Sequence, residues 1–146
     1  MNIPFLQKLT GPVLHKVVGA GPASAERNAA EHVLQRVLAG LPELLAAAVV
    51  RIDTGQLLAC YTTARELNPA KVAAFNAEVV KQKRMALAAL QLEGEVLEDI
   101  LITLTSQLHL LRVLADGERV LYVAVDCRDT NLGIARDVLR NCEEGA

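Results

Sequence analysis

Few residues in this chain are of the types that carry chemistry, and their spacing joins none of them. The cysteines form no C-x-x-C pair, and the histidines form no H-E-x-x-H pair. His109 lies in a predicted strand upstream of Cys127, but nothing in the sequence brings the two together as a nucleophile and its base. We expect structural or surface roles for the three histidines, His15, His32 and His109, and no disulfide scaffold from Cys60, Cys127 and Cys142.

Glycines and carboxylates also lack the spacing of a known site. The chain has no G-x-x-x-x-G-K-[ST] loop, and Gly19-x-Gly21 runs into Pro22, has no third glycine and follows no predicted strand. Four acidic residues after the long helix match no metal-binding loop and predict a solvated loop: Glu93, Glu95, Glu98 and Asp99. We therefore expect no catalytic, cofactor-binding or metal-binding residues, and a protein that is not an enzyme.

Composition narrows the class of protein further. The chain has 146 residues, of which 52% are hydrophobic and only 3% aromatic, and its formal net charge is −2. So apolar a chain with so small a net charge is not disordered, and the lack of a net positive charge and the scarcity of aromatic rings argue against nucleic-acid binding. Three cysteines without a disulfide pattern favour a cytoplasmic location. No apolar run has the length that crosses a membrane.

Residues 1–22 are predicted to form an N-terminal arm, followed by one domain over residues 23–146. The Gly-Ala-Gly-Pro stretch at 19–22 is a hinge-like break between them. Lys8 and His15 interrupt the apolar residues of the arm, which is unlike a signal peptide. Two interpretations stay open: the arm packs on its own domain or a partner, or residues 1–18 contact a membrane.

Hydrophobic periodicity and turn residues predict eight elements in the order α-β-β-α-β-β-β-α. Ser24 is the expected N-cap of the first helix, which stops at Gly40. Asp-Thr-Gly at 53–55 and Asp-Gly at 116–117 predict hairpin turns. Strands are expected at 46–52, 56–62, 99–105, 107–114 and 119–126, and two more helices at 69–92 and 131–141, the last capped by Asp129 or Thr130.

The predicted strands are apolar on both faces. Ile100 and Ile102 share one face, for example, while Leu101 lies on the other. The sheet should therefore be covered on both sides, by one long helix and by two shorter ones. Short turns between neighbouring strands predict a mainly antiparallel α+β sandwich of five strands, whose outer strands can pair with another subunit.

The long helix at 69–92 is the most informative segment. Asn76 and Lys83 lie one heptad apart inside its apolar arc, where polar residues fix register and partner number in paired helices. The helix would then meet its symmetry mate; alternatively, Lys83 extends past apolar neighbours to water. The predicted dimer interface comprises helix residues and two residues of an edge strand: Val72, Asn76, Val79, Lys83, Ile100 and Ile102.

The same helix is basic within an acidic chain. Three cations lie close together on it, Lys81, Lys83 and Arg84, with Glu78 as the helix's one carboxylate. Two interpretations stay open for these cations: they form a patch for an acidic partner protein, or they are a solvated helix face.

In the order of its elements the chain resembles the roadblock/dynein light-chain family, which includes bacterial MglB-like regulators of Ras-like GTPases. The likeness rests on LPELLAAAVVRIDTGQLLA at 41–59, a hairpin ahead of the long helix. It rests also on DILITLTSQLHLLRVLADGERVLYVAVDCRDTNLGIARDVL at 99–139, a late hairpin ahead of the last helix. The individual motifs are degenerate, and their order and spacing over about residues 24–144 carry the resemblance.

The resemblance implies a roadblock-like, profilin/longin-like sandwich and a homodimer in which edge strands join and the long helices lie near each other. It also implies a platform for a small Ras-like GTPase, without a catalytic site or cofactor of its own. We therefore expect a cytoplasmic homodimer that binds and modulates such a GTPase. The alternative is a small-ligand sensor of the PAS/GAF type, against which the aliphatic packing predicts a filled core.

Overall fold

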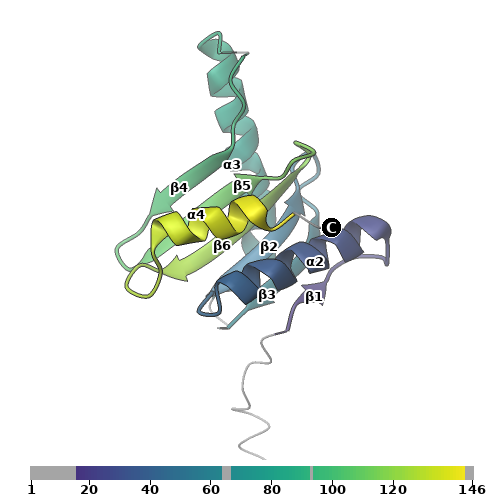
Figure 1. Ribbon diagram of the computed structural model, residues 1–146. Coiled ribbons are helices and arrows are strands. Elements are labelled where there is room, and N and C mark those ends of the chain that lie inside the picture. Colours follow the sequence, from purple (N-terminus) through teal and green to yellow (C-terminus); the bar gives the residue numbers. More distant parts are fainter. Residues whose placement is uncertain (1–15, 64–66, 93, 144–146) are drawn as a thin grey trace, which may run out of the picture.

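A computed structural model describes residues 16–63, 67–92 and 94–143 (Figure 1). These residues form one antiparallel sheet of six strands in the order β1-β3-β2-β6-β5-β4, and three helices. The strands are β1 (Val18–Gly19), β2 (Ala46–Arg51), β3 (Leu57–Thr62), β4 (Asp99–Thr103), β5 (Gln107–Val113) and β6 (Arg119–Asp126); the helices are α2 (Ala25–Gly40), α3 (Pro69–Ala89) and α4 (Leu132–Asn141).

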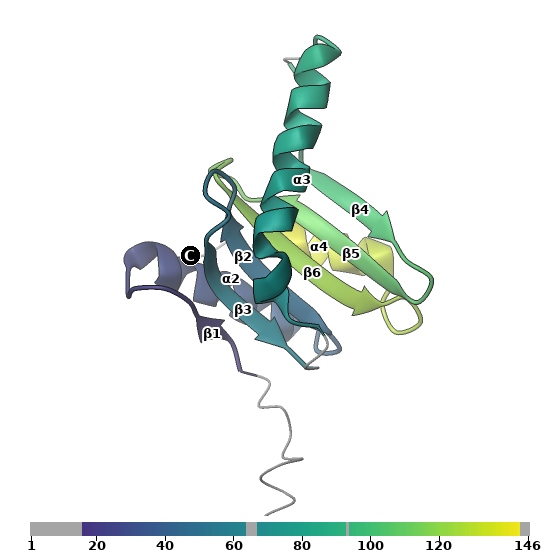
Figure 2. The same ribbon diagram turned by 180° about the vertical axis from the view of Figure 1, so that it is seen from behind.

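The helices lie on both faces of the sheet, as the two-faced strands predict. Helices α2 and α4 lie side by side on one face, and α3 crosses the other (Figures 1 and 2). The central strands β2 and β6 are buried almost throughout, so they supply apolar side chains to a core on each side. One core contains Leu34, Val37, Leu121 and Leu139. The other contains small residues of α3 packed on the sheet.

Side-chain caps start the helices. Ser24 Oγ accepts from the backbone N–H of Arg27 at 3.1 Å, which confirms the predicted N-cap of α2. Helix α4 begins differently from the prediction: Asn131 Oδ1 accepts from Ile134 N at 3.2 Å, so the cap is neither Asp129 nor Thr130. All three residues are good caps by type, and the backbone path after β6 selects the third.

Two hairpin turns lie at the same end of the sheet. Gly55 in the β2–β3 turn and Gly117 in the β5–β6 turn have φ of 72° and 73°. These left-handed values favour glycine, so both predicted turns form for the expected reason. At Gly55 a Cβ would lie 3.1 Å from the Ala74 backbone, so this turn also has to approach helix α3 closely.

The fold class is as predicted, with one strand more. Val18 and Gly19 pair with Cys60 and Ala59 of β3, inside the stretch that the sequence assigns to an arm and a hinge. Two residues carry no periodicity from which such a strand could be predicted. The remainder of the predicted arm, residues 1–15, lies outside the described residues.

The predicted long helix and edge strand are both shorter in the structure. Helix α3 ends at Ala89, ahead of the predicted Leu92, and the chain turns at Gln91, whose φ is 58°. A non-glycine residue thus provides the left-handed turn after the helix. Strand β4 ends at Thr103, two residues early, because Leu104 N donates to Gln107 O across the turn into β5.

Candidate interaction surface

Helix α3 is longer than the sheet beneath it. Its buried side chains are Pro69, Ala73, Ala77 and Val80, which lie in its first half or just past its midpoint. The alanines let this half pack closely on β2 and β3, while the second half extends past the sheet (Figures 1 and 2). The extended half therefore keeps apolar side chains exposed, among them Met85 at 64% and Leu90 at 65%.

An open apolar groove of about 550 Å³ lies between α3 and β4. Phe75, Val79 and Ala86 form its helix wall, and Ile100 comes from the sheet. Phe75 is 73% exposed, although it is the largest apolar side chain on this face. An exposed apolar groove beside a sheet edge is typical of a protein-binding surface.

The groove brings together three of the six residues predicted for the dimer interface: Val79, Lys83 and Ile100. Ile102 lies two residues further along β4, on the same face and partly buried. Val72 is exposed, one helical turn before Asn76. All six therefore lie on α3 or β4, on the side of the sheet that α3 crosses.

Asn76 is the polar residue of this surface that has the least access to water. Its Nδ2 atom is buried and has no hydrogen-bond partner within the described part of the chain. A buried amide without an acceptor costs about 1–3 kcal/mol. The predicted heptad position of Asn76 thus coincides with an unsatisfied donor.

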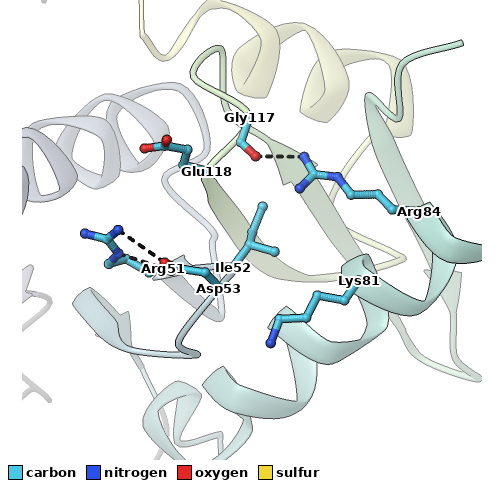
Figure 3. A pocket seen from close by; sticks show the side chains of 7 residues that line it. All are labelled: Arg51, Ile52, Asp53, Lys81, Arg84, Gly117 and Glu118. Atoms are coloured by element: carbon cyan, nitrogen blue, oxygen red, sulfur yellow. Dashed lines mark hydrogen bonds and ion pairs between the residues drawn. The ribbon is translucent and has the colours of Figure 1, made fainter. Parts of the chain in front are cut away.

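The predicted cation patch divides between two sites. Lys81 and Arg84 line a cleft of about 360 Å³ between α3 and the two hairpin turns, with Ile52 at its centre (Figure 3). Lys83 points instead to the apolar groove on the other side of the helix. Helical geometry explains the division, because neighbouring residues differ by roughly 100° around the axis. The cleft is lined by Arg51, Ile52, Asp53, Lys81, Arg84, Gly117 and Glu118.

Some charged side chains of this cleft form ion pairs within the chain, and others do not. Arg51 binds Asp53 at 3.3 Å and Glu26 at 3.1 Å, and it points away from Arg84 (Figure 3). The hydrogen bond between Arg51 and Asp53 raises the pKa of the guanidinium and lowers the pKa of the carboxyl. Arg84 donates to Gly117 O at 2.8 Å and has no ion pair among the described residues. Its charge is therefore open to a partner.

A small polar network lies beside Ile102 on the sheet. His109, paired with Ile102 across β4 and β5, contacts Gln107 Oε1 through Nε2 at 2.8 Å and Tyr122 OH through Nδ1 at 3.2 Å. Partial burial lowers the pKa of His109. The arrangement suits a neutral imidazole that donates from Nε2 and accepts at Nδ1.

Two of the cysteines, Cys60 and Cys142, show no sign of an activated thiol. Burial raises the pKa of Cys60, and burial together with Glu143 raises the pKa of Cys142 to about 11. Within residues 16–63, 67–92 and 94–143, no three His, Cys, Asp or Glu side chains gather where they could hold a metal ion. None of the described helices combines the length and apolarity needed to cross a membrane.

Sequence reasoning missed several residues of the two hollows. Phe75 is part of the predicted apolar arc, but its high exposure depends on how α3 lies on the sheet. Arg51, Ile52 and Glu118 reach the cleft because two hairpin turns meet the helix at one end of the sheet. The two predicted turns were the available signal, but the pairing of β2 with β6, which the sequence does not reveal, is what brings them to one end of the sheet.

No protein-family model and no curated protein matches the chain. Solved structures do match it. Myxococcus xanthus MglB aligns with 86% of this chain and 90% of its own, at a TM-score of 0.67 and 19% identity. The gliding protein MglB from Thermus thermophilus aligns with 84% and 89%, at 0.65 and 16%. The Roadblock/LC7 domain from Streptomyces avermitilis aligns with 83% and 93%, at 0.62 and 17%. The described chain therefore has the Roadblock/LC7 fold.

Proposed function

We propose that this protein is a non-catalytic homodimer that acts as a platform for a small Ras-like GTPase. The observation that carries the proposal is the apolar groove between α3 and β4, which adjoins an edge strand. Two copies related by a twofold axis would place β4 beside β4 and α3 beside α3. Phe75 and Val79 would then be buried in the interface. Full burial of each of these side chains would contribute about 1.5–3 kcal/mol to association.

The proposal that the protein regulates a GTPase is supported by the fold and by the resemblance in the order of the sequence motifs. The chain shares its fold with two structures named MglB, one of them called a gliding protein. Within the roadblock/dynein light-chain family, the sequence resembles the MglB-like regulators of Ras-like GTPases. The platform offers Lys81 and Arg84 beside the cleft to acidic residues of the GTPase. The platform acts by favouring one nucleotide state of its partner.

We place the dimer in the cytoplasm, in keeping with the free thiols of Cys60, Cys127 and Cys142.

The ligand-sensor alternative has less support. A sensor of the PAS/GAF type needs a cavity between the sheet and its helices. Here Leu34, Val37 and Leu121 fill one side and Val80 packs on the other, each fully buried. The hollows described above lie on the surface around α3 instead.

Sedimentation of the purified chain tests the dimer. Phe75→Asp places a charge in the groove and should shift a dimer to the monomer mass. Ile134→Asp is the matched control, because Ile134 is also exposed, at 59%, on helix α4 of the opposite face. Monomeric wild-type protein, or equal masses for the two variants, would contradict the proposed interface.

Binding to a purified small Ras-like GTPase, loaded with GDP or with a non-hydrolysable GTP analogue, tests the partner. We expect measurably tighter binding of one nucleotide state. Lys81→Glu should weaken that binding several-fold, mainly through slower association, while Arg140→Glu on exposed α4 should not. Equal affinity for the two nucleotide states would rule out a state-selective regulator.

A further inference from the structure

Strand β3 has the composition of an unprotected edge strand, which would pair readily with a strand of another molecule. Its six residues, Leu-Leu-Ala-Cys-Tyr-Thr, include no charge, proline or glycine. Natural sheets protect exposed edges with charges, prolines, bulges or a covering segment. In the structure β3 is not the edge, because β1 pairs with it on the side away from β2.

The strand that covers β3 is held by few contacts. Its register joins Val18 to Cys60 and Gly19 to Ala59, and Ala20 N donates to Leu58 O at 2.9 Å. Val18 is 54% exposed, so the apolar contact of this segment is limited to the adjacent Val17, which is only partly buried against the core. Segments with so little buried surface open at low free energy.

One arginine of α2 fastens this segment. Arg27 Nη1 donates to Gly21 O at 2.7 Å, while its Nε binds Glu31 Oε1 at 3.1 Å. Gly19 lies directly against the Arg27–Glu31 pair, where a Cβ would overlap Glu31 Oε1 and Arg27 Nε. A side chain at position 19 would have to displace these two side chains, so the position of β1 and the geometry of this ion pair depend on each other.

We propose that residues 18–21 are a releasable cover of the β3 edge, and that the uncovered β3 pairs with β3 of a second copy. An uncharged strand meets an identical strand without like-charge repulsion, and a twofold axis makes such a pair antiparallel. This edge is the opposite one from β4. Pairing at both edges would join copies into an open-ended chain, so the cover restricts assembly to β4.

Proline at position 20 tests the cover in the full-length protein. Ala20→Pro removes the N–H that binds Leu58 O, and Ala20→Ser keeps it. All variants carry Cys127→Ser, because Cys127 is an exposed thiol. We expect Ala20→Pro to lose amide-exchange protection in β3 and to form species heavier than the wild type, increasingly so at higher concentration. Ala20→Ser should keep the wild-type mass.

A disulfide provides the reverse test. Val18 lies directly opposite Cys60, and directly opposite residues of antiparallel strands have Cα atoms about 4.5–5.5 Å apart, which a disulfide can bridge. In Ala20→Pro protein that also carries Val18→Cys, oxidation should restore the wild-type mass and reduction should bring back the heavier species. Unchanged protection in Ala20→Pro would show that the cover cannot be released, and lost protection without a gain in mass would show that β3 does not self-pair. Either result overturns the proposal. The mass of the wild type alone reports on the β4 dimer, so the two proposals fail separately.

Discussion

The guanidinium of Arg84 donates from Nη2 to the carbonyl oxygen of Gly117 at 2.8 Å, and this bond joins helix α3 to the β5–β6 turn. The two residues are 33 positions apart in the chain. The bond closes one wall of the cleft in Figure 3. It also fixes the start of the half of α3 that has no sheet beneath it.

Arg84→Met should therefore destabilise the fold modestly. The variant keeps an apolar stem but loses a hydrogen bond that is partly shielded from water, which contributes about 1 kcal/mol to the free energy of unfolding. Urea denaturation measures the change. Lys71→Met is the control, because Lys71 is exposed on the same helix and should change stability by less than about 0.5 kcal/mol. Equal effects of the two variants would show that the Gly117 bond contributes nothing.

Gly55→Ala should be more harmful than most surface substitutions. The residue has φ of 72°, and its new Cβ would lie 3.1 Å from the backbone of Ala74 in α3. The left-handed conformation alone costs about 1–2 kcal/mol for alanine. Thermal melting compares this variant with Gly94→Ala, where a Cβ meets nothing within 4 Å. A Gly55→Ala protein as stable as the control would mean that the β2–β3 turn can shift away from α3.

His109 should make stability depend on pH. Burial lowers its pKa in the folded state below the ordinary 6.5, so at mildly acidic pH the unfolded chain binds more protons than the folded one. Its stabilising contribution is complete above pH 6.5 and is lost as the pH falls through that value toward the folded pKa. His109→Gln should remove this part of the decline. Urea denaturation at pH 7.5 and 5.5 measures how much unfolding free energy is lost between the two values. An equal loss in wild type and His109→Gln would contradict the prediction.

Local signals in the sequence predict most of this fold. Ser24 caps α2 as expected, and Gly55 and Gly117 turn the chain where Asp-Gly type sequences predict it. Apolar residues on both faces of β6 predict cover on both sides, which the helices provide. Each of these features depends on a few neighbouring residues, so the sequence contains the information directly.

Features that depend on distant contacts were not predictable in the same way. The pairing of Val18 with Cys60 joins segments some forty positions apart and spans two residues, too few for a pattern. Helical periodicity separates Lys81 from Lys83, but the packing of α3 on the sheet decides which hollow each of them lines. The sequence can place residues on a helix, but the packing of that helix decides which of its faces remains open.

Asn76→Leu should stabilise the single subunit. The Nδ2 atom of Asn76 is buried without an acceptor among the described residues, and leucine has the same branched shape without an unsatisfied donor. We expect the free energy of unfolding to rise by about 1 kcal/mol at concentrations where subunits are separate. Gln82→Leu, on an exposed part of the same helix, controls for helix propensity. In the proposed dimer, the partner subunit can supply the missing acceptor, and the sign should then reverse at high concentration. A gain that is the same at every concentration would show that Asn76 makes no hydrogen bond across the interface and does not set its register.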